Sequence, residues 1–543
     1  MQIREIRCTP FQDQRPGTAG LRKKVRVFQQ PHYLESFVQA VFDALPERGS
    51  GVLVVGGDGR YHNRQAIQTV IAMAAAHGYR RVVVGQHGLL STPAASHVIR
   101  VHKANGGFLL TASHNPAGPE GDFGIKYNLA SGGQASESQT EAIYACSRQL
   151  TRYRIADLPA VDIDRRGLQD FGGFAVEVID PVDDYARLMQ TLFDFDRIRD
   201  LLRTGFRLRF DAMHAVTGPY ARRILVEQLG APQDSLWNAA PREDFAGGHP
   251  DPNLVHARPL VDALFAPDAP DFGAASDGDG DRNMILGRGL FVSPGDSLAV
   301  LAANLHVSPG YREGLAGVAR SMPTCRALDV VAARLGLPCY ETPTGWRFFC
   351  NLLEAGRITL CGEESFGTSS SHVREKDGLW AVLAWLDLLA ARRISVAEIM
   401  RDHWTRFGRH YYVRHDYEEL PADRAQAVMA TLREALGTLP GRSLADLSVT
   451  AADDFCYHDP VDGSESRGQG LRVVFGDAAR IVLRLSGTGT AGATLRLYLE
   501  RYATAADRLA LDPAAVLAQL AQVADALAGI RRITGRAEPD VVT

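Results

Sequence analysis

Three aspartates stand at alternate positions in one short segment, at Asp277, Asp279 and Asp281. The glycines between them let the backbone fold tightly, so that the carboxylates can converge on one ion. Carboxylates without a soft ligand make a hard oxygen site suited to magnesium, with coordination positions left for water or a phosphate oxygen. An EF-hand is disfavoured, because Arg282 and Arg288 stand where its loop needs Gly and Glu. The alternative is a solvated acidic turn, although carboxylates this close repel one another without a cation.

A serine, Ser113, stands in the segment TASHNP, directly after the apolar run GGFLL. A turn at a strand end exposes its side chains and can aim backbone amides at an anion, which suits a nucleophile or a phosphate acceptor. The Gly-x-Ser-x-Gly elbow of acyl hydrolases is absent, and His114 is badly placed to act as triad base for its own neighbour. Alone, a serine in a turn is more often a structural residue that satisfies backbone groups.

Two further glycine-rich segments carry polar groups. GEESFG, residues 362–367, offers carboxylates and a serine to sugar hydroxyls; Glu363 and Glu364 should point to opposite faces of an extended chain, so that one can bind and the other support it. LSGTGTAGATLR, residues 485–496, follows an expected strand and can cradle a phosphate, with a forked contact from Arg496. It is not a Walker loop, because no Gly-Lys-Ser/Thr follows. Taken alone, the first segment is weak evidence, and the second could equally be a flexible turn.

The elements around these motifs predict an α/β fold. An apolar strand over 51–57, a helical pattern over 63–77 and a following strand form a strand–helix–strand unit with a parallel crossover. The same order recurs after the strands predicted at 207–210 and 317–321. These blocks predict three similar α/β domains, with one large doubly wound sheet as the alternative. Strands in the last part of the chain predict a terminal α+β domain.

Composition excludes several classes of protein. A length of 543 residues exceeds what one hydrophobic core supports, so several domains are expected. The net charge of −4 leaves no electrostatic footprint for nucleic acid. Seven scattered cysteines without a Cys-x-x-Cys pair favour a reduced, cytoplasmic location. No apolar run of about 18 residues is present, and the N-terminus is charged, so neither a membrane span nor a signal peptide is expected.

The motifs, taken in order, resemble those of the α-D-phosphohexomutase superfamily, and closely its phosphoglucomutase branch, across essentially the whole chain. The match consists of TASHNP with GDFGIKYN, then DGDGDR, then GEESFG with REKDGLWAVLAWL, then SGTGTAGAT. The resemblance implies three similar mixed α/β domains plus a C-terminal α+β domain around a central cleft. We expect a phosphoserine-bearing domain over 1–185, a metal-binding domain over 186–303, a sugar-binding domain over 304–412 and a phosphate-binding domain over 413–543.

The resemblance also implies roles for particular residues. Ser113 is the expected phosphoserine, and Asp277, Asp279 and Asp281 are expected to bind Mg²⁺ together with a phosphoserine oxygen. The other implied residues fall into three groups: sugar contacts at Thr344, Gly345, Glu363 and Ser365; a distal phosphate site at Ser486, Thr488, Thr490 and Arg496; and cations or proton handlers at Arg22, His114, Lys126, Arg282 and Lys376.

The implied reaction is the interconversion of α-D-glucose 1-phosphate and glucose 6-phosphate through phosphoserine, with glucose 1,6-bisphosphate as intermediate and activator. The expected partner is a phosphosugar, with no nucleic acid and no membrane, and a monomer is expected. Two alternatives remain: a phosphomannomutase or mixed-specificity phosphohexomutase, and a catalytically silent scaffold. The scaffold is disfavoured because it has no need of the serine, the aspartates and the phosphate loop together.

Overall fold

The computed structural model describes residues 1–17, 19–45, 51–444, 447–486 and 492–543. The described chain divides into two compact units. The first comprises Met1–Phe291, Asn304–Gly314 and Ser365–Arg393, and the second comprises Val292–Ala303, Leu315–Glu364 and Ile394–Thr543. Within the described ranges, no helix is long and apolar enough to cross a membrane.

The first unit begins with a mixed sheet in the order β2-β6-β5-β3-β4-β9-β8. Its central strands β5, β3, β4 and β9 run parallel, and β2, β6 and β8 add antiparallel pairs at the two sides. The strands are β2 (Leu21–Lys24), β3 (Val52–Gly57), β4 (Arg81–Leu89), β5 (Gly106–Leu110), β6 (Asp122–Leu129), β8 (Gly167–Asp170) and β9 (Ala175–Ile179), beside a ribbon of β1 (Ile3–Arg7) and β7 (Arg152–Ala156). The helices are α1 (Val25–Phe28), α2 (Tyr33–Ala44), α3 (Asn63–Ala76), α4 (Thr92–Val101) and α5 (Glu137–Ser147).

Helices cover both faces of this sheet, because successive side chains of a buried strand point to opposite sides. Leu53 and Val55 of β3 pack in one core with Ile67 of α3. On the other face, Val54 of β3 and Ile99 of α4 both lie close to Gly107 of β5. The result is the three-layer arrangement expected of a parallel sheet.

The rest of the first unit contains a second sheet in the order β11-β10-β12-β13-β14. Strand β10 is parallel to β11 and β12, and β13 returns antiparallel to β12. The elements are α6 (Asp183–Leu192), α7 (Phe195–Arg203), β10 (Leu208–Asp211), α8 (Thr217–Ala221) with a π-helical continuation over Arg222–Gln228, β11 (Leu236–Trp237), α9 (Arg258–Phe265), β12 (Phe272–Ser276), β13 (Asn283–Gly287), β14 (Leu290–Val292), β18 (Gly367–Ser370) and α13 (Gly378–Arg392). Helix α13 is buried on all sides, as a helix that is apolar all round must be. Its one acidic residue, Asp387, is held by Arg197 at 2.6 Å.

The second unit contains a third α/β block. Strand β15 pairs in parallel with β16 and β17, and the two connections are helical. The elements are α10 (Pro294–Asn304), β15 (Val318–Ser321), α11 (Ala327–Leu335), β16 (Cys339–Thr342), α12 (Trp346–Glu354), β17 (Leu360–Glu363) and α14 (Val396–Phe407). Trp346, Phe349 and Leu352 of α12 pack on Cys361 of β17 to form its core.

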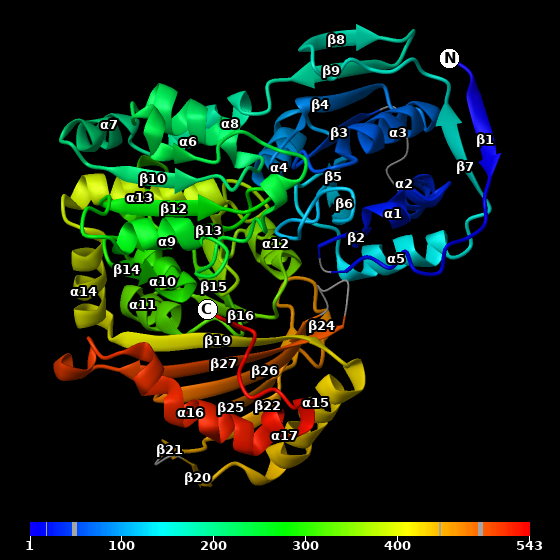
Figure 1. Cartoon of the computed structure of the whole chain (residues 1–543). Coiled ribbons are helices and arrows are strands. Elements are labelled where there is room, and N and C mark those ends of the chain that lie inside the picture. Colours follow the sequence, from blue (N-terminus) through cyan, green and yellow to red (C-terminus); the bar gives the residue numbers. More distant parts are fainter. Residues whose placement is uncertain (18, 46–50, 445–446, 487–491) are drawn as a thin grey trace. The chain divides into compact units, whose positions relative to one another are not determined.

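The chain ends in an antiparallel sheet in the order β22-β25-β26-β27-β19-β28. Helices α15, α16 and α17 lie along one face of it (Figure 1). The elements are β19 (Arg409–Leu420), α15 (Ala422–Ala435), β20 (Ser443–Leu444), β21 (Leu447–Ser448), β22 (Ala451–Asp454), β23 (Tyr457–His458), β24 (Glu465–Ser466), β25 (Leu471–Phe475), β26 (Ala479–Ser486), β27 (Ala493–Ala503), α16 (Pro513–Ala528), α17 (Ile530–Thr534) and β28 (Val541–Val542). Short 3₁₀ turns occur at Gln233–Ser235, Phe245–Gly247, Leu305–Val307, Pro309–Tyr311, Leu436–Thr438 and Ala506–Arg508.

The predicted fold class is confirmed: three α/β blocks precede a C-terminal domain built on an antiparallel sheet. The strand–helix–strand unit predicted from residue 51 onward is β3–α3–β4, with the parallel crossover expected. The domain boundaries near 185, 303 and 412 and the central cleft stay predictions.

Candidate active site

Ser113 lies just beyond the carboxyl end of β5 and adopts a left-handed backbone conformation, with φ of 52°. This conformation costs a non-glycine residue about 1–3 kcal/mol, so neighbouring contacts must hold it. The backbone N–H of Ser113 donates to Thr111 Oγ1 at 2.7 Å, and the Thr111 hydroxyl donates to Asp58 at 2.6 Å. These contacts hold the backbone of Ser113 in its turn at the end of a buried strand.

A buried ion pair, Asp58 with Arg60, supports this turn from the end of β3. Arg60 Nε lies 2.8 Å from Asp58 Oδ2, and both side chains are 0% exposed. The other guanidinium nitrogens donate to the carbonyl oxygens of Ser113 and Asp122, each at 2.8 Å. The sequence prediction missed both residues. Their position in the sequence could have identified them, because they follow a parallel strand directly. Polar residues at that point lie at the edge of the sheet where binding sites form.

The three aspartates lie in the loop between β12 and β13, and all three are buried. One oxygen from each carboxylate lies within 4.8 Å of the others. Asp277 Oδ2 accepts a hydrogen bond of 2.9 Å from the Ser113 hydroxyl. Glycine is required at 278, because a Cβ there would lie 2.2 Å from the Ser113 carbonyl oxygen. The loop and the serine turn therefore form one site.

Burial and mutual repulsion act strongly on these carboxylates. Burial raises the pKa of Asp277 well above its usual value, and the neighbouring Asp281 and Asp279 raise it further. Burial also acts to raise the pKa of Asp279, but Lys126, the Thr92 hydroxyl and Lys376 outweigh it and bring the pKa below its usual value. Thr92 donates to Asp279 Oδ2 at 2.7 Å.

The donor set fits a hard divalent cation. Among the residues that the structure describes, Asp279 Oδ1 and Asp281 Oδ1 are buried and have no hydrogen-bond partner. A buried carboxylate oxygen without a donor is costly unless it binds a metal ion. The predicted cluster thus fits the requirements of a metal site with oxygen ligands only.

Four predicted cationic residues surround the carboxylates. Lys126 Nζ on β6 lies 3.8 Å from Asp279 Oδ2, and Lys376 Nζ lies 3.2 Å from Asp281 Oδ2. The backbone N–H of Arg282 donates to Asp277 at 3.0 Å, and its side chain donates to Asp251 at 3.1 Å. The half-buried Arg22 on β2 donates to Asn115 Oδ1 at 3.4 Å, and desolvation lowers the pKa of its guanidinium. Positive charge is therefore gathered where a phosphoryl group would need it.

Glu375 is a further member of this site that the sequence prediction did not include. It is fully buried, with Oε1 at 3.4 Å from Lys126 Nζ. Asn128 donates to the same oxygen at 2.9 Å, and Gln134 donates to the other at 3.0 Å. Glu375 thus holds the Lys126 ammonium in a defined position. Glu375 could have been found from the sequence because it directly precedes Lys376, which was predicted to belong to the site.

His114 lies next to the serine in space as well as in sequence. Its Nδ1 is 3.4 Å from Ser113 Oγ, and its ring centroid is 6.2 Å from that of His249. A ring nitrogen at this distance from the serine oxygen can exchange a proton with it after a small approach.

The predicted sugar contacts fall in both units. In the second unit, the Gly345 N–H donates to Glu363 Oε1 at 2.8 Å, which joins two of them; Thr344 precedes Gly345 in the chain. The carboxylate of Glu364 has a different partner and accepts a hydrogen bond of 2.7 Å from the Ser321 hydroxyl. This agrees with the expectation that neighbouring side chains of an extended chain point to opposite faces. Ser365 belongs to the first unit and is buried one residue before Phe366, whose carbonyl accepts from Asn283 of β13.

The predicted phosphate site is described only in part. Thr488 and Thr490 lie outside the described residues. Ser486 is the last residue of β26, and Arg496 lies on the adjacent strand β27, with Nε 3.5 Å from Asp416. Two arginines that the sequence prediction missed, Arg414 and Arg484, lie in the same region. Burial acts to raise the pKa of Glu364, but Arg484, Ser321, Arg414 and Arg496 together lower it.

Comparison with known families covers nearly the whole chain. Residues 13–154, 183–289 and 294–407 match the α/β/α domains I, II and III of phosphoglucomutase/phosphomannomutase. Residues 409–540 match the C-terminal domain of phosphoglucomutase-1.

Individual relatives agree with the family matches. The chain is 59% identical to a phosphoglucomutase of Rhizobium radiobacter, with 100% of both chains covered. It is 51% identical to a cytoplasmic phosphoglucomutase of Pisum sativum, with 100% of this chain and 99% of that one covered. The crystal structure of pp63/parafusin, a phosphoglucomutase from Paramecium, superposes with a TM-score of 0.91 at 46% identity, covering 100% of this chain and 99% of that one. Matches of this extent show that the chain belongs to the phosphoglucomutase family of the α-D-phosphohexomutase superfamily, whose members are intramolecular phosphotransferases.

Proposed function

We propose that this enzyme interconverts α-D-glucose 1-phosphate and glucose 6-phosphate by carrying the phosphoryl group on Ser113. The observation that carries the proposal is the 2.9 Å hydrogen bond from Ser113 Oγ to Asp277, in a cluster with the buried Asp279, Asp281 and Lys126. A serine hydroxyl placed against a metal-type carboxylate cluster suits phosphoryl transfer, which depends on charge neutralisation and alignment.

Asp277, Asp279 and Asp281 would hold Mg²⁺ together with an oxygen of phospho-Ser113. When bound, this ion supplies Lewis-acid stabilisation of the charge on the phosphoryl oxygens. Lys376, Arg22 and Arg282 neutralise further charge, and the Asp58–Arg60 pair keeps the serine turn aligned.

In the first step, the phosphoryl group passes from Ser113 to the 6-oxygen of glucose 1-phosphate. The bond from phosphorus to Oγ breaks, and a bond from phosphorus to the sugar oxygen forms. Lys126, held by Glu375, and His114, 3.4 Å from Oγ, are the two proton handlers. The one that is neutral when the step begins takes the proton of the sugar hydroxyl, and the one that is protonated returns a proton to the serine. The product of this step is glucose 1,6-bisphosphate.

The bisphosphate then turns around, and its 1-phosphoryl group passes back to Ser113 by the reverse proton movements. Each end of the sugar must therefore fit the same distal phosphate site, for which we propose Ser486, Thr488, Thr490 and Arg496. Thr344, Gly345, Glu363 and Ser365 would contact the sugar hydroxyls. A site that recognises phosphate by charge and by backbone amides tolerates both orientations.

The test is the mutase assay combined with intact-mass measurement. Ser113→Ala should lose nearly all turnover, and the wild type should carry one phosphate that is lost on adding glucose 6-phosphate and maps to Ser113. Ser138→Ala, at an exposed serine, is the control and should keep full activity. Full activity of Ser113→Ala would disprove the covalent mechanism.

Substrate preference needs its own measurement. We expect higher kcat/KM on glucose 1-phosphate than on mannose 1-phosphate, because the relatives with high identity are phosphoglucomutases. Equal values would favour the mixed-specificity alternative. A cytoplasmic location stays a prediction, since relatives are named from both the cytoplasm and the chloroplast. The monomeric state stays a prediction as well.

A further inference from the structure

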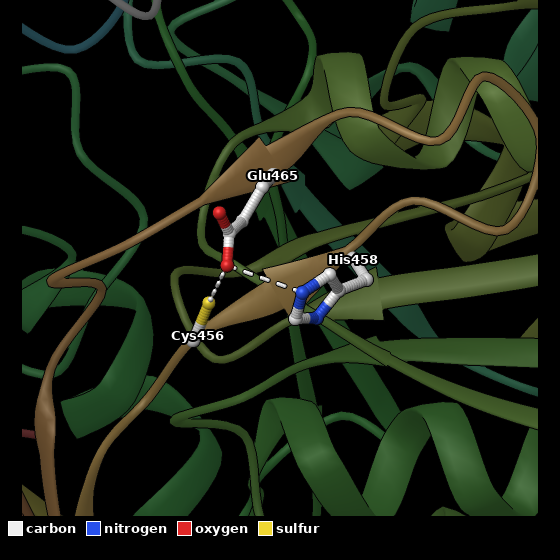
Figure 2. Close-up of side chains that lie close together, drawn as sticks. All are labelled: Cys456, His458 and Glu465. Atoms are coloured by element: carbon white, nitrogen blue, oxygen red, sulfur yellow. Dashed lines mark hydrogen bonds and ion pairs between the residues drawn. The ribbon is translucent and has the colours of Figure 1, made fainter.

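A second group of metal-ligating side chains lies on the hairpin β23–β24, within the second unit. Cys456, His458 and Glu465 point toward one another from its two arms (Figure 2). Cys456 Sγ donates to Glu465 Oε1 at 3.2 Å, and His458 Nε2 lies 3.1 Å from the same oxygen. One ligand atom from each of the three lies within 4.8 Å of the other two.

The hairpin geometry brings these residues together. Cys456 and His458 are two positions apart, so in extended chain they share a face, and His458 is the direct cross-strand partner of Glu465. Tyr457, between them, points to the other face and packs in a core with Phe348 and Tyr498. The three ligand-type side chains are therefore turned outward by a buried anchor.

The tip of the hairpin is braced, which keeps the face preorganised. The Asp459 N–H donates to the Ser464 carbonyl at 2.8 Å, and Asp459 Oδ1 accepts from the Val461 N–H at 2.8 Å. Asn351 of helix α12 donates to Asp459 and Asp462, each at 3.0 Å. The two arms cannot separate without breaking these contacts.

The ligand types differ from those of the aspartate site. A thiolate, an imidazole and a carboxylate are the set that Zn²⁺ and Co²⁺ take in tetrahedral sites, with water as a fourth ligand. Metal–ligand bonds of about 2.0–2.3 Å place tetrahedral ligand atoms about 3.3–3.6 Å apart. The separations of 3.1 and 3.2 Å around Glu465 Oε1 need only a small expansion to match.

We propose that Cys456, His458 and Glu465 form a second metal site, selective for a borderline-soft divalent cation of the Zn²⁺ type. Binding replaces the thiol proton, which passes to solvent, and the ion takes the place of the hydrogen bonds to Glu465. The competing group is Arg467, which pairs with Glu465 Oε1 at 2.9 Å and is 78% exposed, so it can move aside.

The probe is Co²⁺, which is added to the fully reduced enzyme. Excess Mg²⁺ is present to occupy the aspartate site. Absorption from thiolate-to-cobalt charge transfer requires a sulfur ligand, which the aspartate site lacks. We expect this band to saturate at one equivalent of Co²⁺. Cys456→Ser should abolish the band, and His458→Gln should weaken binding by at least about tenfold.

Two further variants complete the test. Cys339→Ser removes another exposed thiol and should leave the band unchanged. Arg467→Gln removes the competing cation and should tighten Co²⁺ binding severalfold. Absence of the band in the wild type, or its persistence in Cys456→Ser, would overturn the proposal. So would loss of the band in Cys339→Ser with Cys456 intact.

Discussion

At the scale of single residues, the site depends on side chains that hold other side chains in place. Glu375 does not contact the serine, yet it is buried against Lys126 together with Asn128 and Gln134. Burial raises the pKa of Glu375, and Lys126 and Asn128 act against that rise. In the proposed mechanism Glu375 therefore orients the proton handler Lys126, a role that is best tested by separating kcat from KM.

We therefore expect Glu375→Gln to lower kcat by about ten- to a hundredfold, because positioned acid–base groups contribute about 10²–10⁴-fold and the variant keeps the lysine but loosens it. KM should stay within about twofold. Steady-state kinetics on glucose 1-phosphate measure both constants. Glu137→Gln, on the exposed start of α5, is the control. An unchanged kcat would show that Lys126 is positioned without Glu375.

Gly278 gives a second test at this scale, because its α-carbon lies against the serine turn. A Cβ at 278 would sit 2.2 Å from the Ser113 carbonyl oxygen, which is fixed by Arg60. Gly278→Ala should therefore displace the loop and lower kcat by about a hundredfold, as expected for misplacement by about 1 Å. Gly437→Ala has open space around its Cβ and serves as control. Retention of wild-type kcat in Gly278→Ala would contradict the close approach of loop and serine.

At the scale of elements, the start of helix α13 fixes the segment that contains Lys376. Asp377 is its N-cap and accepts from the Trp380 N–H at 3.0 Å. The same carboxylate accepts from the Tyr185 hydroxyl at 2.6 Å and lies 2.9 Å from His372 Nε2. Capping and tertiary anchoring are thus combined in one buried residue.

Asp377→Ala should destabilise the protein by about 2–4 kcal/mol, because the cap is lost and buried donors are left without acceptors. Asp512→Ala removes the exposed cap of α16 and should cost only about 1 kcal/mol. Thermal unfolding midpoints of the two variants provide the comparison. Equal shifts would mean that the buried network around Asp377 contributes nothing beyond the cap.

At the scale of the whole molecule, buried histidines make stability depend on acidity. His403 on α14 is 3% exposed, and burial, with help from Arg406 and His410, lowers its pKa from 6.5 to about 4. The folded state therefore binds fewer protons than the unfolded chain below pH 6.5. The associated stability is complete above that pH and is lost as pH falls toward about 4.

Because of His403 alone, the free energy of unfolding should fall by about 2 kcal/mol when the pH is lowered from 7 to 5. Unfolding midpoints at the two pH values should differ less in His403→Gln than in the wild type. His306→Gln, at an exposed histidine, should keep the full difference. An identical pH dependence in His403→Gln and the wild type would show that His403 is not the titrating group.

The sequence by itself determined many of the helices, strands and turns, and the kinds of side chain that make up the candidate site. Strands such as 51–57, the helix after them and the glycine-rich turns depend on local periodicity and backbone freedom, and these can be read along the chain. Ser113, the aspartates and the cations were likewise recognisable by motif. The phosphate loop was predicted from a motif in the same way and stays a prediction, because Thr488 and Thr490 lie outside the described residues.

Only the tertiary structure decided which atoms meet. Ser113 contacts Asp277 across 164 positions, and Lys126 meets Glu375 across 249 positions. No local pattern specifies such pairs, because they follow from the packing of β5, β6, β12 and α13 in one unit. The supporting residues Asp58, Arg60, Asn128 and Glu375 were missed for this reason. The outward cluster on β23–β24 was missed as well, since cross-strand pairing turns scattered cysteine, histidine and glutamate residues into neighbours.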